Sequence, residues 1–448
     1  MRQLVAERVG THVFALALVG VALASAASSA PAARVQIARE STTEPSSRLP
    51  AQAALDMVPL DNAAAPLDSA PTPAPRAAPA AATDGVAAAA TFGADQRQAT
   101  LIFDPRLGLP QWLRAVRDVP LWSAADPGAS AGTALPAGNT YVKPLGPFVE
   151  SRVQVYFPGD GAHPAGQAWV DAAAVEPSGI PPWVAPSSAG ASSLPPPPQR
   201  VSDAPAPETT AVHIAIIDDG SGQLLYGEQP HSEVPQASTT KIATTIVALE
   251  RAPDLNRRVR VTVSASAMAA RDGSSTMGIE PGRSVSLDTL LHGMMLPSGN
   301  DAAEQVAVAL ADSREQYVEW MNQEAAALGL KDTHFANPSG MDAAGHYSSA
   351  YDMAMLARYA MRNATFRELA SATHYTGDGF PMTNLNRFLE LYPGADGVKI
   401  GFTDAAQKTI VASATRDGHR VFVSLMHSQD LVGDCTALFN WVWDSFAW

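Results

Sequence analysis

Clustered prolines limit how much of this chain can fold. The 448 residues include 36 prolines, and many of them lie in two stretches dominated by small and polar residues. The first stretch, residues 27–99, has few large apolar side chains and cannot bury enough surface to offset chain entropy. The second, residues 179–207, contains four consecutive prolines, which favour an extended polyproline geometry. We interpret both as linkers, the first of them disordered, which leaves residues 100–178 and 208–448 to fold.

The first 26 residues have the pattern of an export signal. Arg2 and Arg8 precede an unbroken run of apolar and small residues at 13–23, and Ala24-Ser25-Ala26 then suits a signal peptidase. The run is shorter than the roughly 20 residues that span a bilayer. We therefore predict a cleaved signal peptide, residues 1–26, with an uncleaved N-terminal anchor as the alternative. Either way, the protein would work outside the cytoplasm.

Charge and cysteine content exclude several classes of protein. The net charge of -14 argues against nucleic acid or an anionic membrane surface as a partner, because both require patches of Lys and Arg. The single cysteine, Cys435, cannot form an internal disulfide and is interpreted as a small buried hydrophobe. The scattered histidines lack ligand spacing, so no metal site and no cofactor is predicted.

The two foldable segments differ in pattern. Residues 100–178 contain short alternating stretches such as Arg152–Phe157, separated by turn clusters, which predict a small all-β barrel. Residues 208–448 begin and end with β-hairpin patterns, while the middle has helical spacing of apolar residues. Strands from both ends of the segment with helices between them indicate an α+β domain.

A first polar motif opens a helical pattern. Ser238 would lie at the start of a helix, where the dipole favours a developing alkoxide. Lys241, three residues on, would lie on the same face within reach of the hydroxyl. Burial and a second cation would lower the pKa of its amine enough for it to accept a proton. Taken alone, the pair also fits a capping serine and a surface lysine.

Two further motifs follow in order. In Ser298-Gly299-Asn300, Ser298 would relay a proton towards a leaving amine and Asn300 would hold a substrate amide. In the strand that carries Lys399 and Gly401, the lysine would keep the cleft electropositive and help to keep Lys241 neutral. The glycine would let a substrate backbone approach the strand. In isolation, the first triplet fits helix capping and the second fits a solvent-exposed edge strand.

Together, the three motifs resemble a known set. Ser-x-x-Lys, Ser-Asp-Asn and Lys-Thr-Gly occur in this order in penicillin-binding proteins and class A β-lactamases. Longer stretches, "PQASTTKIATTIVALE", "TLLHGMMLPSGNDAAEQVA" and "GADGVKIGFTDAAQKTIVASATRDGHRV", resemble the serine-type D-alanyl-D-alanine carboxypeptidases, the low-molecular-weight penicillin-binding proteins. The resemblance covers nearly all of residues 208–448 and implies a β-lactamase/transpeptidase-like domain. In residues 100–178, "RVQVYFPGD" and "GQAWVDAAAVEPSG" resemble bacterial Src-homology-type wall modules.

The carboxypeptidase resemblance implies a mechanism. Ser238 would be acylated by the penultimate D-alanine carbonyl of a peptidoglycan stem peptide, with Lys241 as the general base. The terminal D-alanine would leave, and water would release the shortened peptide. Backbone N–H groups of Ser238 and Phe402 would form the oxyanion hole, and Thr403 would help to hold the substrate carboxylate. β-Lactam antibiotics would be covalent inhibitors, and the wall module would be either a tether or a folded spacer.

The chain departs from the family pattern at two places. Ile400 stands where the family has the threonine of Lys-Thr-Gly, and residues 432–434 stand where many relatives place an arginine. Both changes predict weaker recognition of the terminal carboxylate with the acylation chemistry intact. Two alternatives stay open: a β-lactamase, although the deacylating Glu-x-x-Leu-Asn motif is absent, and a wall-binding or regulatory pseudoenzyme.

Overall fold

The computed structural model describes residues 111–160, 162–184 and 194–448. These residues belong to one compact unit of the chain, residues 89–448. The predicted signal sequence and first linker, residues 1–26 and 27–99, lie outside the described residues. Within the described ranges, no helix is long and apolar enough to cross a membrane.

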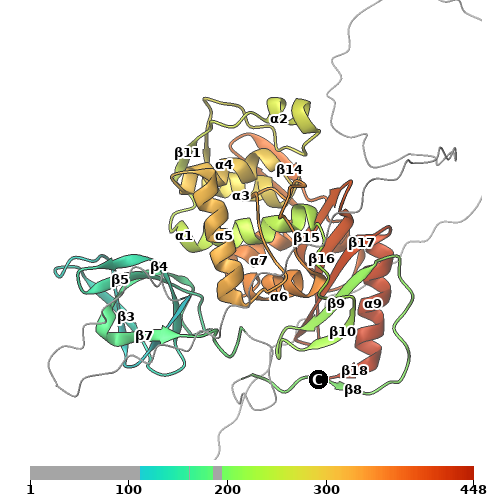
Figure 1. The fold of residues 1–448 in the computed structure, drawn as a ribbon, viewed down its shortest axis with the longest axis horizontal. Coiled ribbons are helices and arrows are strands. Elements are labelled where there is room, and N and C mark those ends of the chain that lie inside the picture. Colours follow the sequence, from blue (N-terminus) through green and yellow to red (C-terminus); the bar gives the residue numbers. More distant parts are fainter. Residues whose placement is uncertain (1–110, 161, 185–193) are drawn as a thin grey trace, which may run out of the picture. The chain divides into compact units, whose positions relative to one another are not determined.

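Residues 112–178 form an all-β module, called the β module below (Figure 1). Its seven strands pair antiparallel in the order β3-β2-β6-β5-β4-β1-β7. The alternating apolar side chains of these strands face one another, and Leu113, Val153, Val155 and Val170 are fully buried between them. The strands are β1 Trp112–Ala115, β2 Val119–Trp122, β3 Ala131–Leu135, β4 Tyr141–Val149, β5 Arg152–Phe157, β6 Gly166–Asp171 and β7 Val175–Ser178.

The larger segment is an α+β domain, as its sequence pattern predicts. A five-stranded antiparallel sheet has the order β10-β9-β17-β16-β15, so strands from the two ends of the segment lie side by side. Helix α9 lies along one face of this sheet and α6 packs on β9 and β17 (Figure 1). The strands are β9 His213–Asp218, β10 Leu224–Glu228, β15 Ala395–Thr403, β16 Gln407–Arg416 and β17 His419–Ser428.

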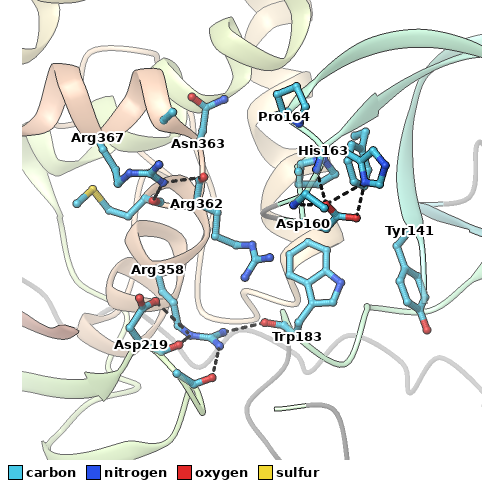
Figure 2. A pocket seen from close by; sticks show the side chains of 18 of the residues that line it. Tyr141, Asp160, His163, Pro164, Trp183, Asp219, Arg358, Arg362, Asn363 and Arg367 are labelled. Atoms are coloured by element: carbon cyan, nitrogen blue, oxygen red, sulfur yellow. Dashed lines mark hydrogen bonds and ion pairs between the residues drawn. The ribbon is translucent and has the colours of Figure 1, made fainter. Parts of the chain in front are cut away.

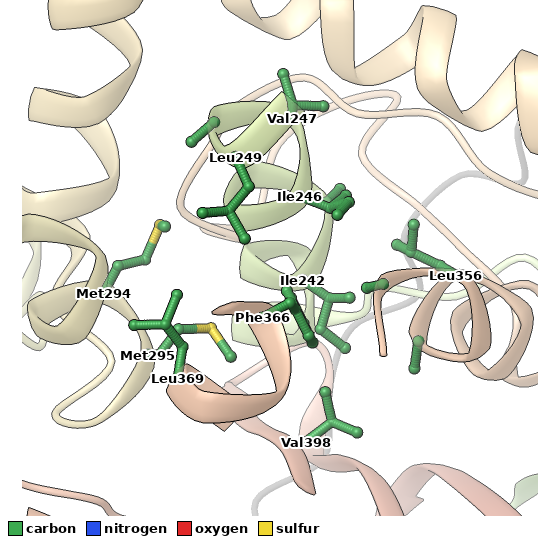
Figure 3. Packing of buried hydrophobic residues seen from close by; sticks show 14 of the residues in the cluster. Ile242, Ile246, Val247, Leu249, Met294, Met295, Leu356, Phe366, Leu369 and Val398 are labelled. Carbon is green, nitrogen blue, oxygen red and sulfur yellow. The ribbon is translucent and has the colours of Figure 1, made fainter. Parts of the chain in front are cut away.

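Helix α1, Lys241–Arg251, is the centre of the helical region. Every residue from Lys241 to Glu250 is buried, because other helices and the sheet surround it on all sides. Figure 3 shows its apolar side chains against those of α3, α7 and strand β15. The other helices are α2 Ala265–Asp272, α3 Leu287–Met295, α4 Asn300–Leu310, α5 Arg314–Leu328, α6 Ala350–Ala360, α7 Ala364–Ser371, α8 Phe388–Leu391 and α9 Leu431–Ser445.

Two local features differ from the sequence expectation. The sequence predicts a last helix over residues 438–446. The helix instead begins at Leu431, because the Asp430 carboxylate accepts the Gly433 N–H and caps it there. Part of the predicted linker 179–207 is held against this helix. Strand β8, Gln199–Arg200, pairs with β18, Phe446–Ala447, at the end of the chain.

The β module contacts the α+β domain through buried polar groups. The Trp112 indole N–H donates to the Ala327 carbonyl at 2.8 Å. Lys143 of β4 forms ion pairs with Glu250 near the end of α1 and with Glu324 of α5, and the aliphatic and charged parts of all three are buried. The α+β domain also contains two small antiparallel strand pairs, β11–β12 (Arg258–Arg260, Ser284–Ser286) and the hairpin β13–β14 (His374–Gly377, Phe380–Thr383).

Candidate active site

The first motif forms a contact between a hydroxyl and a buried amine. Ser238 lies in a 3₁₀ turn, Ala237–Thr240, which leads into α1 at Lys241. The Lys241 Nζ donates to the Ser238 Oγ at 2.9 Å and to the Asn300 Oδ1 at 2.7 Å, and it also donates to the Ser339 carbonyl. No carboxylate of the described residues lies within ion-pair distance of this amine. Ser238 and Lys241 are therefore in direct contact, with the lysine completely buried.

The surroundings of Lys241 favour its neutral form. Burial, followed by the charge of Lys399, lowers the pKa of Lys241 well below its ordinary value, while Glu304 and Asp301 oppose the shift. Burial also lowers the pKa of Lys399, to about 7. A neutral Lys241 amine can accept the Ser238 proton, so the site can activate a nucleophile without a histidine.

The second motif reaches the same site from α4. Asn300 is the first residue of that helix, and its side chain accepts from Lys241 and donates to the Ser274 hydroxyl at 3.1 Å. It thus positions the lysine, a contact that the sequence did not predict. Ser298 is buried and has a left-handed backbone, with φ of 62°. Such a conformation is strained for a residue with a Cβ and is common at functional sites.

Strand β15 carries the third motif along the other side of Ser238. Lys399 is buried and its Nζ donates to the Ile400 carbonyl at 3.0 Å. Gly401 faces the nucleophile: a Cβ built there would lie 2.7 Å from the Ser238 backbone nitrogen. The glycine therefore admits the protein's own backbone, whereas the sequence argument assigned it to the approach of the substrate.

The end of β15 extends into the open. Phe402 is 59% exposed, and the Thr403 hydroxyl donates to the Asp342 carboxylate at 2.8 Å. Asp342 belongs to the loop that also supplies the Ser339 carbonyl to Lys241. This loop and β15 are thus joined across the site, a contact with no signal in the sequence.

His346 is a residue whose position the motifs did not reveal. Its Nδ1 accepts the Ala336 N–H at 2.9 Å, and its Nε2 lies 3.0 Å from the Thr240 hydroxyl and 3.1 Å from the Gln236 side-chain amide. Burial lowers its pKa to about 4, so the ring is neutral at physiological pH. Through Thr240 and Gln236, the ring holds the Ala237–Thr240 turn that bears Ser238.

The two residues that depart from the family pattern, Ile400 and Asp434, lie on the α9 side of the sheet and in α9 itself. Ile400 packs against the apolar cluster on the α9 side of the sheet. Asp434 lies in the first turn of α9 and accepts hydrogen bonds from Thr210 and Ser428 at 2.6 and 2.8 Å. Asp434 therefore fastens the start of the domain to α9.

Among the described residues, no group of three or more His, Cys, Asp or Glu side chains could hold a metal ion.

Comparisons with known proteins agree with this geometry. A family model described as D-alanyl-D-alanine carboxypeptidase, peptidase S11, matches residues 200–430. The carboxypeptidase DacB2 of Mycobacterium tuberculosis is 36% identical over 54% of this chain and 86% of its own length. DacF of Bacillus subtilis is 35% identical over 46% of this chain, and the match spans about half of DacF, 54%.

A solved structure supports the same assignment. The Streptomyces K15 DD-transpeptidase superimposes with a TM-score of 0.52 at 30% identity, and the match covers 54% of this chain and 100% of that one. The predicted transpeptidase-like α+β fold is thereby confirmed. The chain belongs to the peptidase S11 family, the D-alanyl-D-alanine carboxypeptidases.

Proposed function

We propose that this protein is an exported serine D-alanyl-D-alanine carboxypeptidase that removes the terminal D-alanine from peptidoglycan stem peptides. One observation carries the proposal. The Ser238 hydroxyl lies 2.9 Å from a completely buried lysine amine that has no carboxylate of the described residues within ion-pair distance, and burial followed by the charge of Lys399 lowers the pKa of that amine.

The chemistry proceeds through an acyl-enzyme. The Ser238 Oγ attacks the carbonyl of the penultimate D-alanine and its proton passes to the Lys241 Nζ, while the N–H groups of Ser238 and Phe402 stabilise the oxyanion. Ser298 relays a proton to the amine of the departing D-alanine. Water then attacks the ester, Ser238 recovers its proton, and the trimmed peptide leaves with a new carboxylate. β-Lactams would acylate the same Ser238 Oγ as their ring amide bond breaks, and water would hydrolyse the resulting ester more slowly.

Carboxylate recognition is the weak part of this site. Lys399 and Thr403 are the groups available for the terminal carboxylate, and the Thr403 hydroxyl donates to Asp342 instead. Ile400 supplies no hydroxyl, and Asp434 is engaged with Thr210 and Ser428. A hydrogen bond to a charged group contributes about 1.5–3 kcal/mol. We therefore expect slow D-alanine release alongside penicillin acylation of ordinary speed.

A paired assay tests the proposal. The full chain is incubated with a fluorescent penicillin and, separately, with a D-Ala-D-Ala pentapeptide whose products are weighed by mass spectrometry. We expect labelling and release of one D-alanine, both lost in Ser238→Ala. Ile400→Thr should change neither rate by more than about twofold, because residue 400 packs on the α9 side of the sheet, away from the Ser238 site. Labelling without any release would favour the wall-binding pseudoenzyme, and rapid hydrolysis of the penicillin adduct would favour a β-lactamase.

The remaining parts of the chain fit a wall enzyme. Residues 1–26 would direct export, leaving the protein secreted or associated with the cell wall. The β module would be a Src-homology-type wall module. Its buried contacts with Glu250 and Glu324 support a module that is held on the α+β domain rather than tethered loosely.

A further inference from the structure

A cavity of about 970 Å³ lies between the β module and the α+β domain, and Figure 2 shows many of its side chains. One wall consists of residues 139–141 and 157–160 with 162–165, and the other includes residues 358 and 361–365 with Trp183. The volume is in the range of sites that hold small organic ligands. No residue of the three catalytic motifs lines this cavity, so it is separate from the Ser238 site.

The cavity is basic although the chain is acidic. Arginines 358, 362, 367 and 420 line it, against the two carboxylates of Asp160 and Asp219. The chain as a whole has 30 Lys and Arg against 44 Asp and Glu. The local excess of positive charge is therefore a property of this cavity rather than of the surface in general.

Two of the arginines have their charge already compensated. Arg420 forms an ion pair with Asp396 at 2.8 Å. Arg358 is buried and donates to the carbonyl groups of Asp219 and Trp183 at 2.6 and 3.1 Å. These contacts make a rigid floor, because they tie α6 to the end of β9 and to the segment that carries Trp183.

The other two arginines have no carboxylate within ion-pair distance among the described residues. The Arg362 guanidinium lies over the Trp183 ring at 4.4 Å, and that ring stacks on the buried Tyr359. Arg367 donates to the carbonyls of Met361 and Arg362 at 2.7 and 2.8 Å. Both cations are thus held in place before any ligand arrives, which lowers the entropic cost of binding.

The facing wall is polar but does not neutralise these cations. The Asp160 carboxylate accepts the N–H groups of Ala162 and His163 and contacts the His163 ring, so it is satisfied within its own loop. Figure 2 shows the Asp160–His163 pair across the cavity from Arg362. An anion with polar groups beside it would therefore complete a site that the protein leaves open.

We propose that this cavity binds a carboxylate-bearing glycopeptide segment of the cell wall, separate from the segment that enters the Ser238 site. The inference rests on the proposed function, because that function makes a polymer with repeated peptide carboxylates the natural ligand. Planar guanidinium groups bind carboxylates through paired hydrogen bonds, and the polar wall of Asp160 and His163 suits the hydroxyl and amide groups beside such a carboxylate. Trimming exchanges the terminal carboxylate of the stem peptide for that of the shortened peptide, so the cavity would hold the enzyme on wall both before and after processing.

The test measures binding of peptidoglycan disaccharide-peptide oligomers to the full chain, before and after acylation with penicillin. Arg362→Gln should weaken binding about tenfold or more, since it removes a charged donor that has no carboxylate partner among the described residues. Arg260→Gln, an exposed arginine of β11 outside the cavity, is the matched control and should bind like the unaltered chain. Oligomers with amidated carboxylates should bind weakly, and raised salt should weaken the unmodified ones.

Each other outcome overturns the inference. Equal binding by Arg362→Gln, or by amidated oligomers, would remove the anion site. Loss of binding on penicillin acylation would place the ligand in the Ser238 site. Preferential binding of a glycerol-phosphate polymer would replace the proposed ligand with a phosphate. Failure of the proposed function would be seen in a different measurement: the same preparations would show neither penicillin labelling nor D-alanine release.

Discussion

The two ends of helix α1 bury lysine amines in opposite ways. At its first residue, Lys241 is buried among neutral acceptors and beside another lysine. Near its last residue, Glu250 forms an ion pair with Lys143 of the β module, and Lys143 also pairs with Glu324. The Lys143 amine lies over the Tyr359 ring at 4.6 Å as well. One helix therefore holds a reactive amine at one end and a charge-compensated amine at the other.

The comparison teaches that burial alone does not decide what a lysine does. Removing an amine from water favours its neutral form unless an opposite charge accompanies it. At Lys241 no carboxylate of the described residues lies within ion-pair distance, and burial and the charge of Lys399 outweigh the opposing charges of Glu304 and Asp301. At Lys143 two carboxylates do, and a fixed interdomain contact results. Breaking such a buried pair on one side is costly, because the remaining charges have no partner.

The largest expected effect is at the reactive end. Lys241→Met should slow penicillin acylation on the order of 10³–10⁴-fold, because the general base is gone. The folded protein should persist, since no buried charge loses its partner. Stopped-flow or gel-based labelling measures the first effect and urea denaturation the second. Acylation at the unaltered rate would show that another group accepts the Ser238 proton.

A lysine-to-methionine substitution at the other end of α1 should lower stability and leave acylation nearly unchanged. Lys143→Met leaves Glu250 and Glu324 buried together, so the free energy of unfolding at pH 8 should fall by about 3–5 kcal/mol. The rate of penicillin labelling of the folded fraction should stay within about twofold. Lys331→Met, at an exposed lysine, is the matched control for the denaturation measurement. A stability equal to that of the control would mean that the interface is not maintained in solution.

A smaller effect concerns pH at the interface. Burial, followed by the charge of Glu324, raises the pKa of Glu250 to about 7. The folded state therefore binds more protons than the unfolded state between the ordinary pKa and about 7, and stability falls as pH rises through that window. Glu250→Gln should remove about 3 kcal/mol of this pH dependence, by the size of the shift.

Denaturation curves between pH 4.5 and 8.5 measure this slope. Glu315→Gln, at an exposed position in the first turn of α5, is the control and should keep the slope of the unaltered chain. An unchanged slope in Glu250→Gln would assign the pH dependence to another group.

The smallest effect concerns pH at the reactive end. Burial lowers the pKa of Lys399 to about 7, so its charge is lost as pH rises above that value. In the proposed reaction this charge binds the substrate carboxylate, so kcat/KM for D-alanine release should fall by about fivefold between pH 7 and 8. Lys399→Arg keeps the charge and should flatten the decline. A flat profile in the unaltered chain would contradict the assignment of Lys399.

Local patterns were sufficient to predict much of the fold. The hairpins of β9–β10 and β16–β17 follow from alternating residues around turns, and the helical spacing of residues 242–250 matches α1. The contact between Ser238 and Lys241 follows from their separation of three residues. Each of these features depends on neighbours in the chain, which a single sequence displays directly.

Contacts between distant segments could not be predicted in this way. Lys143, Glu250 and Glu324 come from three elements far apart in the chain, and no motif marks them. The same holds for the Thr403–Asp342 hydrogen bond. The hydroxyl lost at Ile400 was visible in the sequence, but not that the side chain packs on the α9 side of the sheet. Such positions depend on how helices and sheets pack on one another, which a single sequence does not reveal.

The pairing of β8 with β18 has a mechanical consequence. The Val201 N–H donates to the Ser445 carbonyl at 2.8 Å and the Trp441 indole to the Ala204 carbonyl at 3.0 Å, so residues 199–204 are fastened along the end of α9. Once the contacts of the β module with the α+β domain had broken, tension applied through the chain before residue 199 would next load this short strand pairing. The central sheet, including the strand that carries Lys399, would bear no tension until the pairing of β8 with β18 breaks.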